Sequence, residues 1–590
     1  MFWQFVYRNR YAVFFITLLF CFFQFSVRKL YGFSIYPDEF SYWAYAAVAS
    51  GCDWSEVISL GSFYSYGYSI LLFPVFLLCK NPVMAYRMAV AVNFVLLSLS
   101  YMLLYAIQLK NGGRIDKTGR VENEKAQLYA GMAVLYPPLL FYAQTTMAET
   151  LLLFGYLLLL LLIKKYLYRP GFFLLLLIFV LNFYLYLVHM RTVGTLAVCA
   201  AVLFFTALKR KRAYKEALLI LLLMVLVLLA AELREQKVML YLYRDLNREL
   251  YEINTYEGQL EKIKYIFSRT GWTAFAAGLS GKILYLGIST YGLGWWGVLY
   301  LIRRIRRFGK GGLTALAVDD AGLLSLFTAL SVVAQIGVST VYNVIPDSYD
   351  SITFGRYQDY IMPVVIIAGI REMVGQIREK KRYLLFTVLL LAFLSVVVAV
   401  YAARLELTQN KGYFMTGMSF FEMREFSPAV FYAGTCVIGI LCMSFVSGVI
   451  FLYCRVRQQH VLLFSIPLSL ILAIHLGSLY LYPFNELARQ DIRLTERMAG
   501  LVADEAYESQ LTYLDYNEIS AIGLVQFALR DLPVRVVSGC GEEIEIPYEE
   551  IGVRSILLLG ANDPRQAKLE SMYEKEVISG HFVLLYNERK

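Results

Sequence analysis

The sequence predicts an all-α protein that crosses a membrane many times and ends in a small α/β domain. Hydrophobic residues occupy 59% of its 590 positions and charged residues only 17%, whereas a soluble domain has roughly 25% charged residues. Long apolar runs alternate with short basic loops up to residue 484, and a soluble composition begins at about residue 485. Because a spanning helix needs about 20 apolar residues, we expect about 13 transmembrane helices over residues 1–484 and a separate domain over residues 485–590.

The charge distribution indicates a membrane rather than a nucleic acid as the partner. The net charge is +10, but the basic residues gather in short loops between apolar runs, which is how cytoplasmic loops orient a membrane protein. The 46 tyrosines and 40 phenylalanines suit aromatic belts at the two membrane surfaces. We therefore expect a multi-pass protein of the plasma (inner) membrane, surrounded by lipid, with no nucleic-acid partner.

The first apolar run, over about residues 11–31, follows Arg8 and Arg10 and ends without a small-residue cleavage site. We expect it to remain as the first helix, with the amino terminus inside the cell. The loop over residues 32–62 then lies outside. It contains Asp38 and Glu39, two adjacent carboxylates among aromatic residues.

The next apolar piece, over about residues 62–79, is short for a span and contains Gly67 and Pro74. We expect it to lie in the membrane interface, which keeps the basic loop over residues 110–125 inside. The following helices are expected over about residues 82–109, 126–143, 171–189 and 217–233. Between them, one helix is expected to end at residues 164–165 and another at residues 209–212.

An external segment is expected over residues 234–290, with a charged helix over 235–264 and a Gly-rich interfacial element over 272–288. Basic clusters at residues 303–307 and 378–382 mark inner helix ends. The remaining spans are expected over about residues 291–302, 321–341, 383–401, 428–453 and 461–481. One further span is expected to begin at residues 353–363.

The last hundred or so residues are then delivered to the outside. Short apolar runs predict strands at residues 511–516, 534–537, 555–559 and 582–586, with a helix over 517–529. This small domain has no Gly-rich phosphate loop and no nucleophile motif. We expect it to have an accessory role.

The eight cysteines do not predict a metal site. Six of them lie in or beside apolar runs, without metal-ligand spacing. Cys52 and Cys540 alone fall in predicted external segments. A disulfide between these two is the alternative to the two unpaired thiols that we expect.

Asp38 and Glu39 are the first candidates for chemistry because they lie close to a predicted membrane surface. A carboxylate there can accept a proton from an attacking hydroxyl. The alternative is a solvated acidic pair. Adjacent residues of a helix point about 100° apart, so only one of the two is expected to face the reacting atoms.

Further candidates lie at other outer helix ends. Glu149 begins the fourth helix beside the Tyr136-Pro137-Pro138 break, where an acidic residue is either a site residue or a favourable charge at a helix start. Arg356, followed by Tyr357, opens another helix from outside and can offer a fork of donors to a phosphate; the alternative is an arginine that reaches the interface.

Three more basic side chains are candidates of the same kind. His189 and Arg191 lie at the outer end of the fifth helix and could meet an anion, although a plain helix end explains them equally well. Lys282, in the interfacial element, is a weaker candidate for the same purpose.

Together these motifs resemble the GT-C membrane glycosyltransferases, and within them the protein-mannosyltransferase and aminoarabinose-transferase branch. The likeness rests on the acidic pair, the segment Tyr66–Leu72, Met147-Ala148-Glu149, and Gly355-Arg356-Tyr357 with Pro363, and it covers about residues 1–370. Each motif is weak alone, and their order and side of the membrane give the resemblance its weight.

The resemblance implies transfer of a sugar from a polyprenyl-phosphate donor to a lipid, glycan or protein acceptor on the extracytoplasmic side. It implies Asp38 as the general base, Glu39 as its neighbour, Glu149 as an acceptor or sugar contact, and Arg356 as a donor-phosphate ligand. Residues 62–66 depart from the Pro-rich or Lys-bearing start of the family's interfacial segment, so one phosphate contact stays unassigned. No cofactor is certain, and because the family varies in metal use, a divalent metal stays open.

Other functions share many of these features. A transporter or flippase of lipid-linked sugars would also have many spans, but charges near the middle of spans and matching halves would be expected. A surface-polysaccharide polymerase or ligase would depend on a large external loop. A membrane scaffold without catalysis is the remaining alternative.

Overall fold

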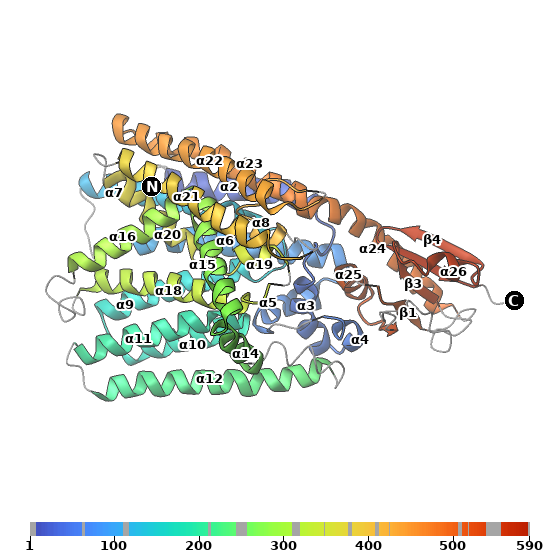
Figure 1. Cartoon of the computed structure of the whole chain (residues 1–590). Helices are drawn as coiled ribbons and strands as arrows, with labels where there is room; N and C mark the ends of the chain where they lie inside the picture. The colour runs from blue at the N-terminus through green and yellow to red at the C-terminus, as the bar shows by residue number, and fades with distance from the viewer. Residues whose placement is uncertain are drawn as a thin grey trace.

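The long helices of the protein run side by side as a bundle, and a small α/β domain lies at one end of it (Figure 1). The computed structural model describes residues 8–61, 65–109, 117–209, 214–243, 256–308, 319–346, 348–375, 380–407, 412–423, 425–504, 510–516, 519–537 and 556–587. Cys540, half of the disulfide alternative, lies outside these residues. Cys52 is a free thiol that donates a hydrogen bond to Asp531 Oδ1 at 3.2 Å.

The first half of the chain forms most of the bundle. Its helices are α2 (Arg10–Val27), α3 (Asp38–Ala49), α4 (Ser55–Ile58), α5 (Gly67–Leu78), α6 (Pro82–Gln108), α7 (Lys117–Val134), α8 (Pro137–Tyr142), α9 (Glu149–Tyr168), α10 (Phe172–Val188), the 3-10 turn η1 (Met190–Thr192), α11 (Val193–Lys209) and α12 (Tyr214–Tyr243).

The second half adds further bundle helices and the terminal domain. Its elements are α14 (Tyr256–Ile266), α15 (Arg269–Ser289), α16 (Leu293–Phe308), α18 (Asp320–Tyr342), α19 (Asp350–Thr353), α20 (Met362–Gly375), α21 (Lys380–Ala402), η4 (Gly412–Met415), α22 (Pro428–Val456), η5 (Gln459–Ser465), α23 (Ile466–Leu476), η6 (Gly477–Leu481), α24 (Tyr482–Ala503), β1 (Leu511–Leu514), α25 (Ile519–Leu529), β2 (Val534–Val537), β3 (Ile556–Gly560), α26 (Gln566–Glu570), β4 (Lys575–Ser579) and β5 (Phe582–Tyr586).

The polytopic α-helical class is confirmed. Among the described residues, nine helical stretches are long and apolar enough to cross a membrane, and shorter apolar helices such as α10 pack beside them. The segment expected to lie in the interface is the 12-residue helix α5, which is too short to span. The total of about 13 spans and the inside position of the amino terminus stay predictions.

Two parts of the bundle differ from the expected pattern. The third predicted span is two helices, because Pro137 cannot continue α7 and instead occupies the first position of the new helix α8. The expected external segment also differs: α12 continues to Tyr243, and α15 is a full helix of 21 residues. Figure 1 shows α14 and α15 lying across the direction of the long helices.

The terminal domain is a five-stranded mixed sheet with the order β2-β1-β3-β5-β4. β1 pairs in parallel with β2 and β3, whereas β5 pairs antiparallel with β3 and β4. Strand β4 was not expected, because this edge strand alternates half-buried and exposed residues and carries Lys575 and Glu576. Helix α24 runs continuously through residue 485, so the sheet begins only after this helix has left the bundle.

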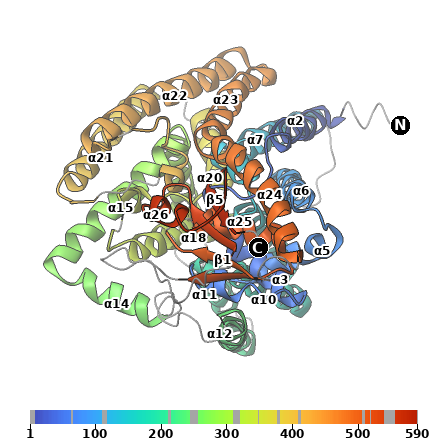
Figure 2. The ribbon, with the colours of Figure 1, turned by 90° about the vertical axis from the view of Figure 1, so that its right-hand side faces the viewer.

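The terminal domain packs against α3 and the segment just before it, and Figure 2 shows α25 near α3. Helix α25 packs on α3, and the Phe527 ring lies 4.8 Å from the Phe33 ring and 4.9 Å from the Trp43 ring. Asn485 Oδ1 accepts hydrogen bonds from the backbone nitrogens of Tyr31 at 2.7 Å and Gly32 at 3.1 Å. These contacts brace the chain on both sides of the acidic pair, which begins α3.

Candidate active site

Asp38 is the first residue of α3 and lies in the wall of a cavity. Pro37 precedes it with φ of −62°, which suits the entry into a helix. The Tyr36 hydroxyl anchors this entry by donating a hydrogen bond to the Tyr413 carbonyl oxygen. The Asp38 side chain is buried, and its carboxylate forms an ion pair with Nη1 of Arg356.

Arg356 joins Asp38 to a second buried carboxylate. Its Nε donates to Glu149 Oε1 at 2.6 Å, and the same oxygen accepts from Arg191 Nη2 at 3.0 Å. The two carboxylates alternate with the two guanidinium groups, so this buried cluster is electrically neutral. The pairing offsets much of the cost of removing each charge from water. Four chain segments that are far apart in sequence thus meet at one point.

The buried cluster still has hydrogen-bonding capacity. Among the described residues, Arg356 Nη2, Arg191 Nε and Nη1, and Glu149 Oε2 have no hydrogen-bond partner. Buried polar groups of native proteins are nearly always paired, and unpaired ones call for an explanation such as a ligand or ordered water. Arg356 is the one of these residues that also lines the cavity.

The cavity has a volume of about 200 Å³. Drug-sized ligand pockets measure about 300–1,000 Å³, so this space suits the polar head of a ligand rather than a whole lipid. Its lining residues are Pro37, Asp38, His189, Tyr342, Asn343, Ser348, Asp350, Ser351, Phe354, Arg356, Tyr357, Tyr413 and Phe414. Polar groups therefore face Asp38 and Arg356 across a space with aromatic walls.

Glu39 has different surroundings from Asp38. Its Oε1 accepts from the Ser34 backbone nitrogen at 2.7 Å and from the Ser34 hydroxyl, and its Oε2 accepts from the Thr146 nitrogen at 2.6 Å, the Thr146 hydroxyl at 2.7 Å and the Tyr86 hydroxyl at 3.0 Å. Burial raises the pKa of this carboxyl, against the effect of these hydrogen bonds. Glu39 does not line the cavity; it ties α3 to α6 and to the loop before Glu149.

His189, Arg191 and Tyr357 form one packed group beside the cavity. His189 Nδ1 accepts from the Arg191 backbone nitrogen at 3.3 Å, and its ring meets the Tyr357 ring edge-on at 5.5 Å. The Arg191 guanidinium lies 4.7 Å from the centre of the Tyr357 ring.

Lys282 is fully buried and does not line the cavity. Its Nζ donates to the carbonyl oxygens of Ser351 at 2.6 Å and Ile352 at 3.1 Å. Burial lowers the pKa of this amine to about 7. Lys282 therefore holds the wall that supplies Ser351 to the cavity, rather than facing a ligand itself.

Asp359 is a buried acidic residue to which the sequence had given no role. It accepts hydrogen bonds from the Tyr136 hydroxyl at 2.7 Å and from the Tyr285 hydroxyl at 2.9 Å, and burial raises its pKa to about 7. Its position three residues after Arg356 was the only available signal. The cavity residues Tyr413 and Phe414 belong to η4, where no motif marked them.

Comparison with solved structures confirms, at the level of the fold, the resemblance predicted from the sequence. No protein-family description matches the sequence, and no curated protein matches it. The structure is similar to that of ArnT from Cupriavidus metallidurans in the apo state, with a TM-score of 0.52 and 13% identity over 98% of each chain. It is also similar to ArnT from the same organism bound to undecaprenyl phosphate, with a TM-score of 0.53 and 14% identity over 98% of each chain.

Proposed function

We propose that this protein transfers a sugar from a polyprenyl-phosphate donor to an acceptor at the extracytoplasmic face of the membrane, with Asp38 as the general base. The observation that carries the proposal is the convergence of Asp38 and Arg356 on one cavity, in a fold shared with a protein crystallised with undecaprenyl phosphate. The acceptor is a lipid, glycan or protein that presents a hydroxyl or amine.

The extracytoplasmic location is supported by the charge pattern along the helices. Helix α16 ends with Arg303, Arg304, Arg306 and Arg307, and such clusters face the cytoplasm. Helix α3, which begins at Asp38, and the terminal domain lie toward the other end of the bundle (Figure 1). A lipid donor would reach the cavity there, with its isoprenoid tail in hydrocarbon and its sugar among polar residues.

The donor phosphate would bind Arg356. The guanidinium already donates Nη1 to Asp38 and Nε to Glu149, and its unpartnered Nη2 is available to a phosphate oxygen. Glu149 and Arg191 do not line the cavity; we assign them to holding the Arg356 guanidinium in one orientation. Its interaction with the phosphate would strengthen as negative charge builds on the leaving group.

In the reaction, Asp38 accepts the proton of the acceptor group while the acceptor atom attacks the anomeric carbon. The bond between that carbon and the phosphate oxygen breaks in the same step, and polyprenyl phosphate departs with the electron pair. One displacement inverts the configuration at the anomeric carbon, as in inverting glycosidases. The ion pair with Arg356 engages Oδ2 of Asp38, so in the proposed step the other carboxylate oxygen, Oδ1, accepts the proton.

The carboxylates of the site are better arranged to pair with arginine than to bind a divalent cation. Asp38 and Glu149 are both bound to Arg356. Among the described residues no group of three or more His, Cys, Asp or Glu side chains could hold a metal ion. The proposed step therefore uses the chain's own residues only.

The test is sugar transfer in proteoliposomes supplied with polyprenyl-phosphate sugars and candidate acceptors. We expect Asp38→Asn to abolish transfer with normal expression and folding, whereas Asp53→Asn, in the same loop but outside the cavity, should retain it. Full activity of Asp38→Asn would remove Asp38 as the base. Movement of the intact lipid-linked sugar across the bilayer without transfer would instead support a transporter.

A further inference from the structure

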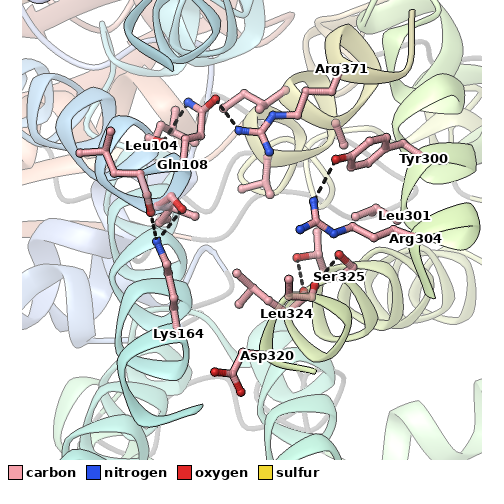
Figure 3. A pocket seen from close by; sticks show the side chains of 17 residues that line it. Leu104, Gln108, Lys164, Tyr300, Leu301, Arg304, Asp320, Leu324, Ser325 and Arg371 are labelled. Atoms are coloured by element: carbon pink, nitrogen blue, oxygen red, sulfur yellow. Dashed lines mark hydrogen bonds between the residues drawn. The ribbon is translucent and has the colours of Figure 1, made fainter. Parts of the chain in front are cut away.

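A second and larger cavity lies at the end of the bundle opposite Asp38. It has a volume of about 330 Å³ and is enclosed by α6, α9, α16, α18 and α20 (Figure 3). Its lining includes Lys164, which follows Glu149 by 15 positions along α9, or about 22 Å at 1.5 Å per residue. The cavity is therefore separate from the candidate active site.

Three basic side chains surround this cavity from different helices. Figure 3 shows Lys164 of α9, Arg304 of α16 and Arg371 of α20 around the same space. Asp320 is the one acidic residue in the described lining, so the cavity carries an excess of two positive charges. All three cations are half-buried rather than fully exposed, so solvent screens them only in part.

Two of these cations lack a compensating carboxylate. Lys164 Nζ donates to the carbonyl oxygens of Ile107 at 2.9 Å and Leu109 at 2.6 Å, and Arg371 Nη2 donates to Gln108 Oε1 at 3.1 Å. Neither forms an ion pair with any carboxylate of the described residues. Because both cations line the same cavity, their positive charges repel each other. An anion between them would relieve this repulsion.

The rest of the lining is mainly apolar and includes Leu104, Leu324 and Ile367. Leu109, at the edge of the cavity, is exposed. A site with a cationic rim and an apolar body matches a molecule that has an anionic head and a hydrocarbon chain. A freely soluble anion would leave the apolar surface uncovered.

We propose that this cavity binds an anionic phospholipid from the leaflet around this end of the bundle, with its phosphate between Lys164 and Arg371 and an acyl chain along the apolar lining. The charge excess and the apolar lining carry the proposal, which does not depend on the proposed transferase function. Arg304 lines the same cavity from the α16 side.

The test is native mass spectrometry of the delipidated full-length protein, titrated with phosphatidylglycerol or with phosphatidylcholine of the same acyl chains. We expect the anionic lipid to bind more tightly. A basic residue near an anionic lipid surface contributes about 1 kcal/mol, or roughly fivefold in affinity. Lys164→Gln and Arg371→Gln should each lose about that much affinity for phosphatidylglycerol and little for phosphatidylcholine.

Lys165→Gln is the matched control, because Lys165 is the exposed neighbour of Lys164 and lies outside the cavity. It should bind like the unmodified protein. If Lys164→Gln fails to fold after losing its bonds to the end of α6, Arg371→Gln decides the result. Equal binding of both lipids, or unchanged affinity in Arg371→Gln, would overturn the proposal. Displacement of the lipid by inorganic phosphate alone would instead identify a soluble anion as the ligand.

Discussion

Replacing Glu39 by Gln should damage stability far more than a change of one atom suggests. Each carboxylate oxygen accepts from a backbone N–H, Ser34 at 2.7 Å and Thr146 at 2.6 Å, and these two groups cannot rotate away. Whichever way the new amide is turned, its NH₂ faces one of these N–H donors. One buried backbone donor is then left unsatisfied.

The magnitude follows from the bonds that are lost. A hydrogen bond to a charged group contributes about 1.5–3 kcal/mol, and an unsatisfied buried donor costs about 1–3 kcal/mol. We therefore expect Glu39→Gln to lower the free energy of unfolding by about 2–5 kcal/mol. Asp38→Asn should cost less, because Asp38 lies at the cavity and Arg356 retains Glu149 as a partner.

The assay compares the unfolding midpoints of the two variants in detergent with their transfer rates in proteoliposomes. Glu39→Gln should show the lower midpoint, and the surviving folded fraction should retain some transfer. Asp38→Asn should show a near-normal midpoint without transfer. A Glu39→Gln protein with an unchanged midpoint and no transfer would refute the positioning role and make Glu39 part of the chemistry.

Three further predictions follow from other contacts. Arg356→Lys keeps the charge but cannot hold Asp38, Glu149 and a phosphate together. The KM for the lipid donor should therefore rise about tenfold or more, which corresponds to the loss of one charge-assisted hydrogen bond. An unchanged KM would contradict phosphate binding by Arg356. Asp359 has an ordinary pKa of 3.8, raised to about 7 in the folded protein, so the native state binds the extra proton and the free energy of unfolding should fall as pH rises from about 4 to 7. In Asp359→Asn the free energy of unfolding, measured with denaturant at each pH, should not show this fall. Parallel pH profiles of the variant and the unmodified protein would disprove the raised pKa of Asp359. Phe527→Ala should cost about 3–5 kcal/mol of stability, detected as release of the terminal domain to limited proteolysis, whereas the exposed Met572→Ala should change little.

The sequence predicted the membrane class and most helices because apolar runs of spanning length leave few alternatives. The break at Pro137 was visible, but the separate six-residue helix α8 was not, since hydropathy does not distinguish a bent span from a straight one. Strand β4 was not predicted, because an edge strand with one face in solvent lacks an apolar run.

The candidate site was predictable as a set of residues but not as an arrangement. Asp38, Glu149 and Arg356 were marked by position, yet their ion pairs depend on how four distant segments pack. The difference between Asp38 and Glu39 depends on which partners each carboxylate meets. From the sequence, Lys282 was a candidate to bind an anion. Only the packing shows that its ammonium group donates its hydrogen bonds to backbone carbonyl oxygens instead.

The contact between α25 and α3 has a consequence for biogenesis. Residues 32–62 are synthesised before the bundle helices that follow them, whereas Phe527 and Arg530 are synthesised only after those helices. Until then the aromatic rings of Phe33, Trp43 and Trp54 lack their final neighbour, and Arg530 has not yet bonded the carbonyl oxygens of Phe76 and Cys79. The segment that carries the acidic pair is thus completed by a helix that is synthesised long after it, so a product that ended before α25 would leave this aromatic surface open to quality-control proteases.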